Sequence, residues 1–198
     1  MLSRRRSSIR PKQRRQESLW KRRKTTIQYL LYFAAGLLLG SLAAVLCGVE
    51  TIPYWILENQ IQTIPEQGLF ALWRERLLFM AILLLYLMIA GQCLWGNGMI
   101  PVAPLLFGLG QGTVVSLLLI LLGLGGIGFI LLGFILPRTV QLAALILLCN
   151  LAHNSCGKFG GDTEVTGQQT VLWLFGAALL TAGTLLEAVL KLKLATTI

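Results

Sequence analysis

Sixty-one consecutive residues without a charge, residues 77–137, read LLFMAILLLYLMIAGQCLWGNGMIPVAPLLFGLGQGTVVSLLLILLGLGGIGFILLGFILP. About 20 apolar residues in a helix cross the hydrocarbon core of a bilayer, which is roughly 30 Å thick. The run is therefore long enough for two membrane spans and part of a third. The whole chain is 56% hydrophobic and only 13% charged, whereas soluble domains carry about 25% charged residues. These values predict an all-α integral membrane protein.

Glycine and proline divide this apolar run into separate spans. The second span is predicted at residues 77–96 and ends at the GNG of residues 96–98 and at Pro101, because these residues break a regular helix. The third span is predicted at residues 100–121 and the fourth at residues 127–149. A turn between them is indicated by four closely spaced glycines, Gly123, Gly125, Gly126 and Gly128.

Two further spans are predicted on either side of this run. Residues 28–48 form the first span and residues 169–190 the fifth, since both segments are long, apolar and nearly free of charge. The connecting residues 49–76 and 150–167 are more polar. The sequence thus predicts about five transmembrane helices within a helical membrane domain of residues 25–198.

The N-terminal residues 1–24 hold most of the charge. They contain eleven Lys or Arg and one acid, Glu17, so they carry a net charge of +10, while the whole chain carries +9. We expect a disordered basic tail that stays in the cytoplasm by the positive-inside rule and is attracted to anionic lipids. A nucleic-acid-binding arm or an organelle transit peptide is a weaker interpretation, because no folded basic domain and no amphipathic apolar stripe are visible. We expect the protein in the cell membrane with its N-terminus in the cytoplasm. Five spans then place the C-terminus on the outer side.

Small residues spaced four apart indicate close helix packing. Gly36 and Gly40 have this spacing in the first span, which lets two helix backbones approach each other. The glycines of residues 108–112 are only superficially similar to a phosphate-binding loop, because no Gly-Lys-Ser/Thr ending follows them. Helix packing or a local break explains them better.

No constellation typical of an enzyme is visible. Cys149, His153 and Cys156 could share one helical face, but a structural zinc site normally takes four ligands and no fourth is evident. We therefore predict no catalytic, cofactor-binding or metal-binding residue.

Arg138 is the residue that most needs a partner. A charge near the middle of a span is costly, so it usually faces protein or water and pairs with another group. Glu187 is the carboxylate placed within a predicted span, which makes the two a candidate intramembrane pair. The alternative is that the fourth helix breaks at Pro137 and that Arg138 reaches water.

From residue 77 to the C-terminus, the chain resembles the stage II sporulation protein M family. The resemblance depends on the order and spacing of four elements more than on one motif. Gly112, Pro137 and Glu187 are the family-motif positions within them. The elements are QGTVV at residues 111–115, the glycine turn at residues 125–128, FILP at residues 134–137, and LLEA at residues 185–188.

The resemblance implies a non-catalytic scaffold in the mother-cell membrane during sporulation engulfment. Members of this family anchor two cell-wall-degrading partners, the stage II sporulation proteins D and P, so hydrolysis would belong to those partners. From the residues themselves we predict no cofactor and no nucleic-acid partner. The chain departs from the family pattern at Gln111, Arg138 and Ala144.

Two other functions remain open. A small membrane transporter or permease subunit also has spans interrupted by proline and glycine, with a charge among them. A general membrane assembly factor is the other. Expression confined to sporulation would favour the scaffold, and a neighbouring ATPase gene would favour the transporter.

Overall fold

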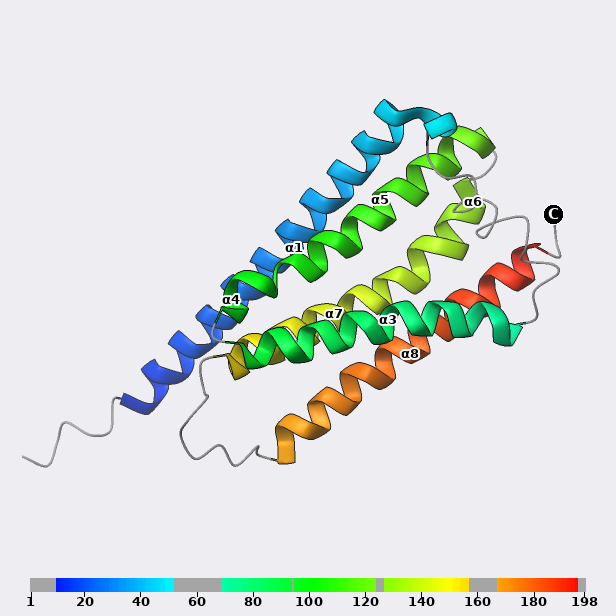
Figure 1. Ribbon diagram of the computed structural model, residues 1–198. Helices are drawn as coiled ribbons and strands as arrows, with labels where there is room; N and C mark the ends of the chain where they lie inside the picture. The colour runs from blue at the N-terminus through cyan, green and yellow to red at the C-terminus, as the bar shows by residue number, and fades with distance from the viewer. Residues whose placement is uncertain (1–9, 52–68, 94, 124–126, 157–166, 196–198) are drawn as a thin grey trace, which may run out of the picture.

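We describe the protein from a computed structural model, in which residues 10–51, 69–93, 95–123, 127–156 and 167–195 are described. Within these ranges all regular secondary structure is helical. In chain order the elements are α1 (Arg10–Thr51), α3 (Leu69–Gln92), α4 (Gly96–Met99), α5 (Val102–Leu122), α6 (Ile127–Ile130), the π-helical segment η3 (Leu131–Ile135), α7 (Leu136–Ser155) and α8 (Gly167–Ala195) (Figure 1).

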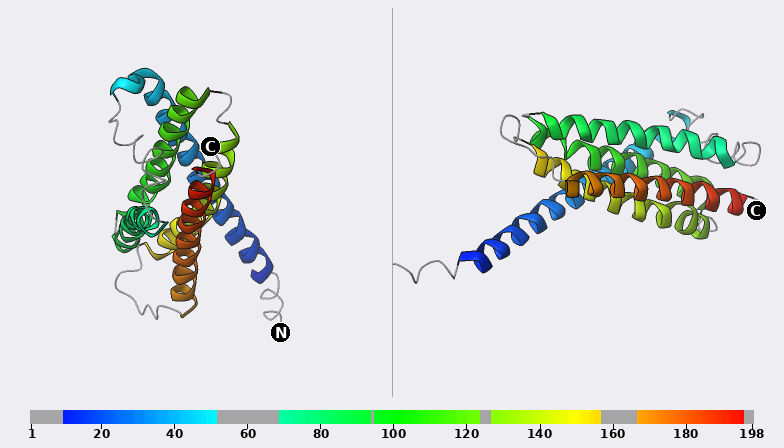
Figure 2. Two further views of the ribbon diagram at one scale, coloured as in Figure 1. Left: turned by 90° about the vertical axis from the view of Figure 1, so that its right-hand side faces the viewer. Right: turned by 90° about the horizontal axis from the view of Figure 1, so that it is seen from below.

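The long helices form one elongated bundle. α1, α5 and α8 run in one direction along it, and α3 and α7 run in the opposite direction (Figure 1). The N-terminal part of α1 leaves the bundle at an angle, as both views of Figure 2 show. This alternation is the one that five successive membrane crossings require.

Within the described residues, four helices are long and apolar enough to cross a membrane. They are Arg23–Leu46, Gly96–Leu121, Leu131–Ser155 and Gln169–Lys193. For the described residues the prediction of a multi-pass all-α protein is therefore confirmed, and these helices correspond to the predicted first, third, fourth and fifth spans.

The helix predicted as the second span differs from its expected bounds. α3 begins at Leu69 and ends at Gln92, four residues before the predicted end, because a turn at Cys93 and Trp95 already precedes the glycines of α4. Its first third contains Arg74, Glu75 and Arg76, and the charge-free residues 77–92 that follow give a rise of about 24 Å.

The predicted disordered tail is wrong from Arg10 onward, because α1 is helical over 42 residues. Pro11 stands in the first turn, where its missing N–H is not needed. Residues 12–35 contain neither glycine nor proline, so nothing in the sequence interrupts the helix. Residues 1–9 lie outside the described part.

The fourth predicted span is also longer than expected. It continues to Ser155 instead of residue 149, because polar side chains near its end bond within the helix or to α1. Asn150 Nδ2 donates to Ile146 O and to Thr26 Oγ1 of α1, and Ser155 Oγ donates to Leu151 O. These bonds satisfy the polar groups that made this segment resemble a loop.

The region before Pro137 is a continuous helix with one irregular turn. The π-helical segment Leu131–Ile135 precedes α7, and Pro137 occupies the first turn of α7. Proline cannot donate the backbone hydrogen bond that a regular helix requires, and a wider turn accommodates this loss without a break. The alternative in which the helix breaks at Pro137 is therefore not observed.

The apolar core lies where α3, α5, α7 and α8 meet, with Tyr29 and Phe33 contributed by α1. Leu87, Leu145 and Leu148 are fully buried in it. Many large apolar side chains point outward instead, and Leu38 on α1 is 69% exposed. Outward leucines of this density suit contact with lipid and not with water.

α1 and α5 approach each other through glycine. A Cβ atom added to Gly36 or Gly40 would collide with the carbonyl oxygen of Leu105 or Leu109 on α5. From the other side, a Cβ at Gly112 would collide with the carbonyl oxygen of Leu37. The expected helix packing at Gly36 and Gly40 is thus present, and α5 contributes matching glycines.

Candidate functional site

Glu187 on α8 is surrounded by polar side chains from neighbouring helices. Its Oε1 accepts hydrogen bonds from Arg138 Nη2 at 2.7 Å and from Lys191 Nζ at 2.8 Å. Its Oε2 accepts one from Gln141 Nε2 at 3.1 Å. Arg76 Nε of α3 lies 4.0 Å from Oε1. The carboxylate therefore connects α3, α7 and α8.

Arg138 extends the network to α5. With its amide oxygen turned toward the guanidinium, Gln111 accepts from Arg138 Nη1 and, at 3.2 Å, from Nε. The guanidinium carbon also lies 5.9 Å from the centre of the Phe107 ring, within the range of a cation–π interaction. Arg138 thus uses its planar set of donors on two helices at once.

We call this polar network the Glu187 cluster. It comprises Arg76, Gln111, Arg138, Gln141, Glu187 and Lys191.

The cluster lies inside the bundle. Glu187 is 1% exposed, and Gln141 and Thr184 are fully buried. Lys191 is 3% exposed, and its Nζ lies 4.0 Å from the centre of the Phe134 ring in the π-helical segment. Such burial strengthens each interaction, because the local dielectric constant is far below that of water.

Helical spacing explains how two of the helices present these groups. On α8, Thr184, Glu187 and Lys191 follow one another at intervals of three and four, so they share one face. On α7, Arg138 and Gln141 are three apart and face the same neighbour. A Cβ added to Gly183 would lie only 2.8 Å from Gln141 Cγ, so glycine on α8 makes room for the glutamine.

The cluster contains more positive than negative charge. Three cations, Arg76, Arg138 and Lys191, surround the one carboxylate of Glu187. Two buried polar atoms in this region have no partner among the described residues, namely Gln141 Oε1 and Trp73 Nε1. Trp73 packs on Ala188 next to Glu187. The arrangement can hold helices together and attract an anion, and it provides no nucleophile paired with a base.

The structure brings together Arg138 and Glu187, the two residues expected to pair. Of the other family-motif positions, Gly112 packs on α1 and Pro137 is buried at the start of α7. Sequence reasoning missed the contributions of Arg76, Gln111, Gln141 and Lys191. Only Lys191 had a readable signal, since it stands four residues after Glu187 on one helix.

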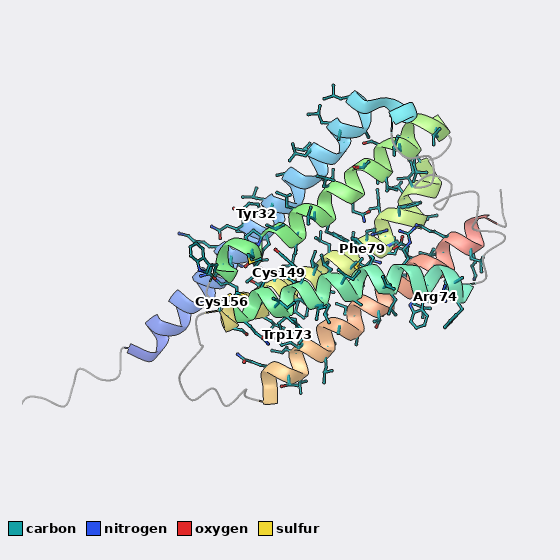
Figure 3. All side chains as sticks on the ribbon, viewed as in Figure 1. Tyr32, Arg74, Phe79, Cys149, Cys156 and Trp173 are labelled. Atoms are coloured by element: carbon teal, nitrogen blue, oxygen red, sulfur yellow. The ribbon has the colours of Figure 1, made fainter. Side chains whose placement is uncertain are left out.

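Figure 3 labels Cys149 on α7 and Cys156 directly after this helix, away from the end of α3 where Arg74 lies. Cys149 is fully buried, and Cys156 Sγ donates to Ala90 O at 3.6 Å. Partial burial raises the pKa of the Cys156 thiol, and the nearby Cys93 raises it further. In the described part of the chain, no group of three His, Cys, Asp or Glu residues could hold a metal ion.

No model of a known protein family matches the chain, and neither a curated protein nor a solved structure matches it.

Proposed function

We propose that the protein is a non-catalytic scaffold in the cell membrane that anchors partner cell-wall hydrolases during sporulation engulfment. In this proposal the chain crosses the membrane five times, with α3 as the second span and the N-terminus in the cytoplasm. The partners are the stage II sporulation proteins D and P, and the present chain supplies their attachment and not the hydrolysis.

The observation that carries the proposal is that the buried charged side chains bond to one another between helices. Glu187 bonds to α7 and to its own helix, and Arg138 carries the network on to α5. Polar groups that bond to one another between helices hold those helices in one arrangement. A fixed arrangement of spans suits a membrane platform on which other proteins assemble.

The positions that resemble the sporulation family support the same function. Gly112 permits the close contact of α5 with α1, and Glu187 is the centre of the polar cluster. Pro137 lies between the π-helical turn and Arg138. Each of these residues therefore holds the bundle together, which is the role that a scaffold demands of its own motif residues.

Affinity capture of the tagged full-length protein tests the proposal. The wild-type protein captured from sporulating cells should retain two cell-wall hydrolases. Deletion of its gene should arrest engulfment. The Glu187→Leu variant should lose the complex, whereas the matched control Arg74→Gln, an exposed residue of α3, should retain it. Capture of no hydrolase, together with normal engulfment in the deletion strain, would contradict the proposal.

A small transporter or permease subunit is the second candidate. It is favoured by one observation, the π-helical turn that stands directly before the buried Pro137 and the charged Arg138. Irregular helices next to buried charges are common in transport pathways. Constitutive expression, an associated ATPase and solute uptake into proteoliposomes would favour this candidate over the scaffold.

A further inference from the structure

The three cations of the Glu187 cluster differ in their distance from the carboxylate and in their exposure. Arg138 and Lys191 lie within 2.8 Å of Glu187 Oε1, whereas Arg76 Nε lies 4.0 Å away. Arg76 is also the most exposed of the three cations, with 24% of its side chain accessible, against 14% for Arg138 and 4% for Lys191. Of the three cations, Arg76 is therefore the farthest from the Glu187 carboxylate and the most accessible.

The position of Arg76 along the bundle is close to one membrane surface. Glu187 lies eight residues before Ala195, where α8 ends, which corresponds to a rise of about 12 Å. Arg76 stands near the start of α3, and this part of α3 lies beside the last part of α8 (Figure 1). A long arginine side chain at this depth reaches the headgroup level by extending along the helix.

Two aromatic residues mark the same level. Phe70 and Trp73 on α3 form an edge-to-face pair with ring centres 6.1 Å apart, and Phe70 is 71% exposed. Aromatic rings of this kind favour the boundary between hydrocarbon and headgroups. Figure 3 labels Arg74 in this region of α3, and Lys193 lies in the last turn of α8. The start of α3 and the end of α8 thus present cations beside aromatic residues of the kind that favour the headgroup level.

We propose that Arg76, supported by Lys191 and Arg138, binds the phosphodiester of an anionic phospholipid between the start of α3 and the end of α8. Among the described side chains one carboxylate, Glu187, faces three cations, and a phosphate would add negative charge in this medium of low dielectric constant. A phosphate oxygen that enters between α3 and α8 also offers an acceptor to Trp73 Nε1, a buried donor without a partner among the described residues. The acyl chains would lie on the outward apolar surface, where Phe79 and Ile82 of α3 are more than half exposed.

Thermal unfolding of the full-length protein in a neutral detergent tests this site. Phosphatidylglycerol should raise the melting temperature by about 3–5 °C when its concentration is about ten times the Kd. Phosphatidylcholine, which has no net charge, and inorganic phosphate at the same concentration should give at most a small shift.

Variants of α3 locate the effect. Arg76→Gln should remove the difference between the two lipids, and Arg76→Lys should retain most of it. The matched control Arg74→Gln should behave as the wild type, because Arg74 is exposed and forms no ion pair with Glu187 among the described residues. If Arg76→Gln does not fold, native mass spectrometry decides, since the wild type should retain one phosphatidylglycerol more firmly than phosphatidylcholine.

Three results would overturn the lipid site. The first is an equal response to both lipids in the wild type. The second is an equal response to phosphatidylglycerol and inorganic phosphate, which would indicate a site for a free anion. The third is the co-purification of a membrane protein with the wild type but not with Arg76→Gln, while lipid has no effect on the melting temperature. That result would assign Arg76 to a carboxylate of a partner helix.

Discussion

Arg138 Nη2 lies 2.7 Å from Glu187 Oε1, although 49 residues separate the two along the chain. Arg138 belongs to the first turn of α7, and Glu187 lies in the last third of α8. The π-helical turn before Pro137 keeps α7 continuous, so the guanidinium points into the bundle and not toward water. The pair therefore fixes the register of two antiparallel helices.

Removal of either partner should destabilise the protein. We expect Glu187→Leu to lower the free energy of unfolding by about 3–5 kcal/mol, because buried cations are then left without their carboxylate. Arg138→Leu should cost less, since Glu187 keeps Lys191 and Gln141. The double variant should lose less than the sum of the single losses, with a coupling of about 0.5–3 kcal/mol. Unfolding in detergent micelles measures all four proteins, and strictly additive losses would reject the pair.

Glycines on the two faces of α5 should respond differently to alanine. In Gly112→Ala the new methyl group meets the carbonyl oxygen of Leu37, so α1 and α5 must separate, at a cost of about 1–3 kcal/mol. Gly110→Ala is the matched control, because nothing lies within 4 Å of an added Cβ there. It should be neutral or stabilise the helix by up to about 1 kcal/mol. Equal melting temperatures for the two variants would contradict close packing of α1 on α5.

Reporter fusions should alternate along the chain. Fusions after Lys24, within residues 55–70, within residues 157–166 and after Ile198 should report inside, outside, inside and outside. The charge of +10 on residues 1–24 predicts the first location, and the alternating directions of the long helices in Figure 1 predict the rest. A C-terminus on the same side as the N-terminus would show that α3 does not cross the membrane.

The basic N-terminal segment should act through its total charge. Replacement of Arg14, Arg15, Arg22 and Arg23 by glutamine should weaken insertion or invert the first span, because the positive-inside bias depends on the number of cations. A single replacement should have little effect. Protease protection of membrane vesicles measures the orientation. RNA binding that persists at physiological salt would instead favour the nucleic-acid-binding interpretation.

The central pair of the candidate site, Arg138 and Glu187, could be predicted, and the other four residues could not for a physical reason. A charge in an apolar segment needs a partner wherever the helix lies. The positions of Arg138 and Glu187 within predicted spans therefore indicate a pair. Gln141 and Gln111 carry no charge and look like ordinary polar residues of a span. Arg76 stands where α3 begins, so the sequence alone made it a boundary residue. Only the antiparallel packing of α3 on α8 brings it within 4.0 Å of Glu187.

The sequence by itself determined that the chain is helical and apolar enough for a membrane, because charge-free runs leave no other way to satisfy the backbone. It also indicated Gly36 and Gly40 as positions of close packing, since small residues four apart in a helix let another backbone approach. The tertiary structure decided which helix receives them, pairing Gly36 and Gly40 of α1 with Gly112 of α5. It likewise decided that one carboxylate serves three cations, because side chains far apart in the chain meet only when helix directions and depths are set together.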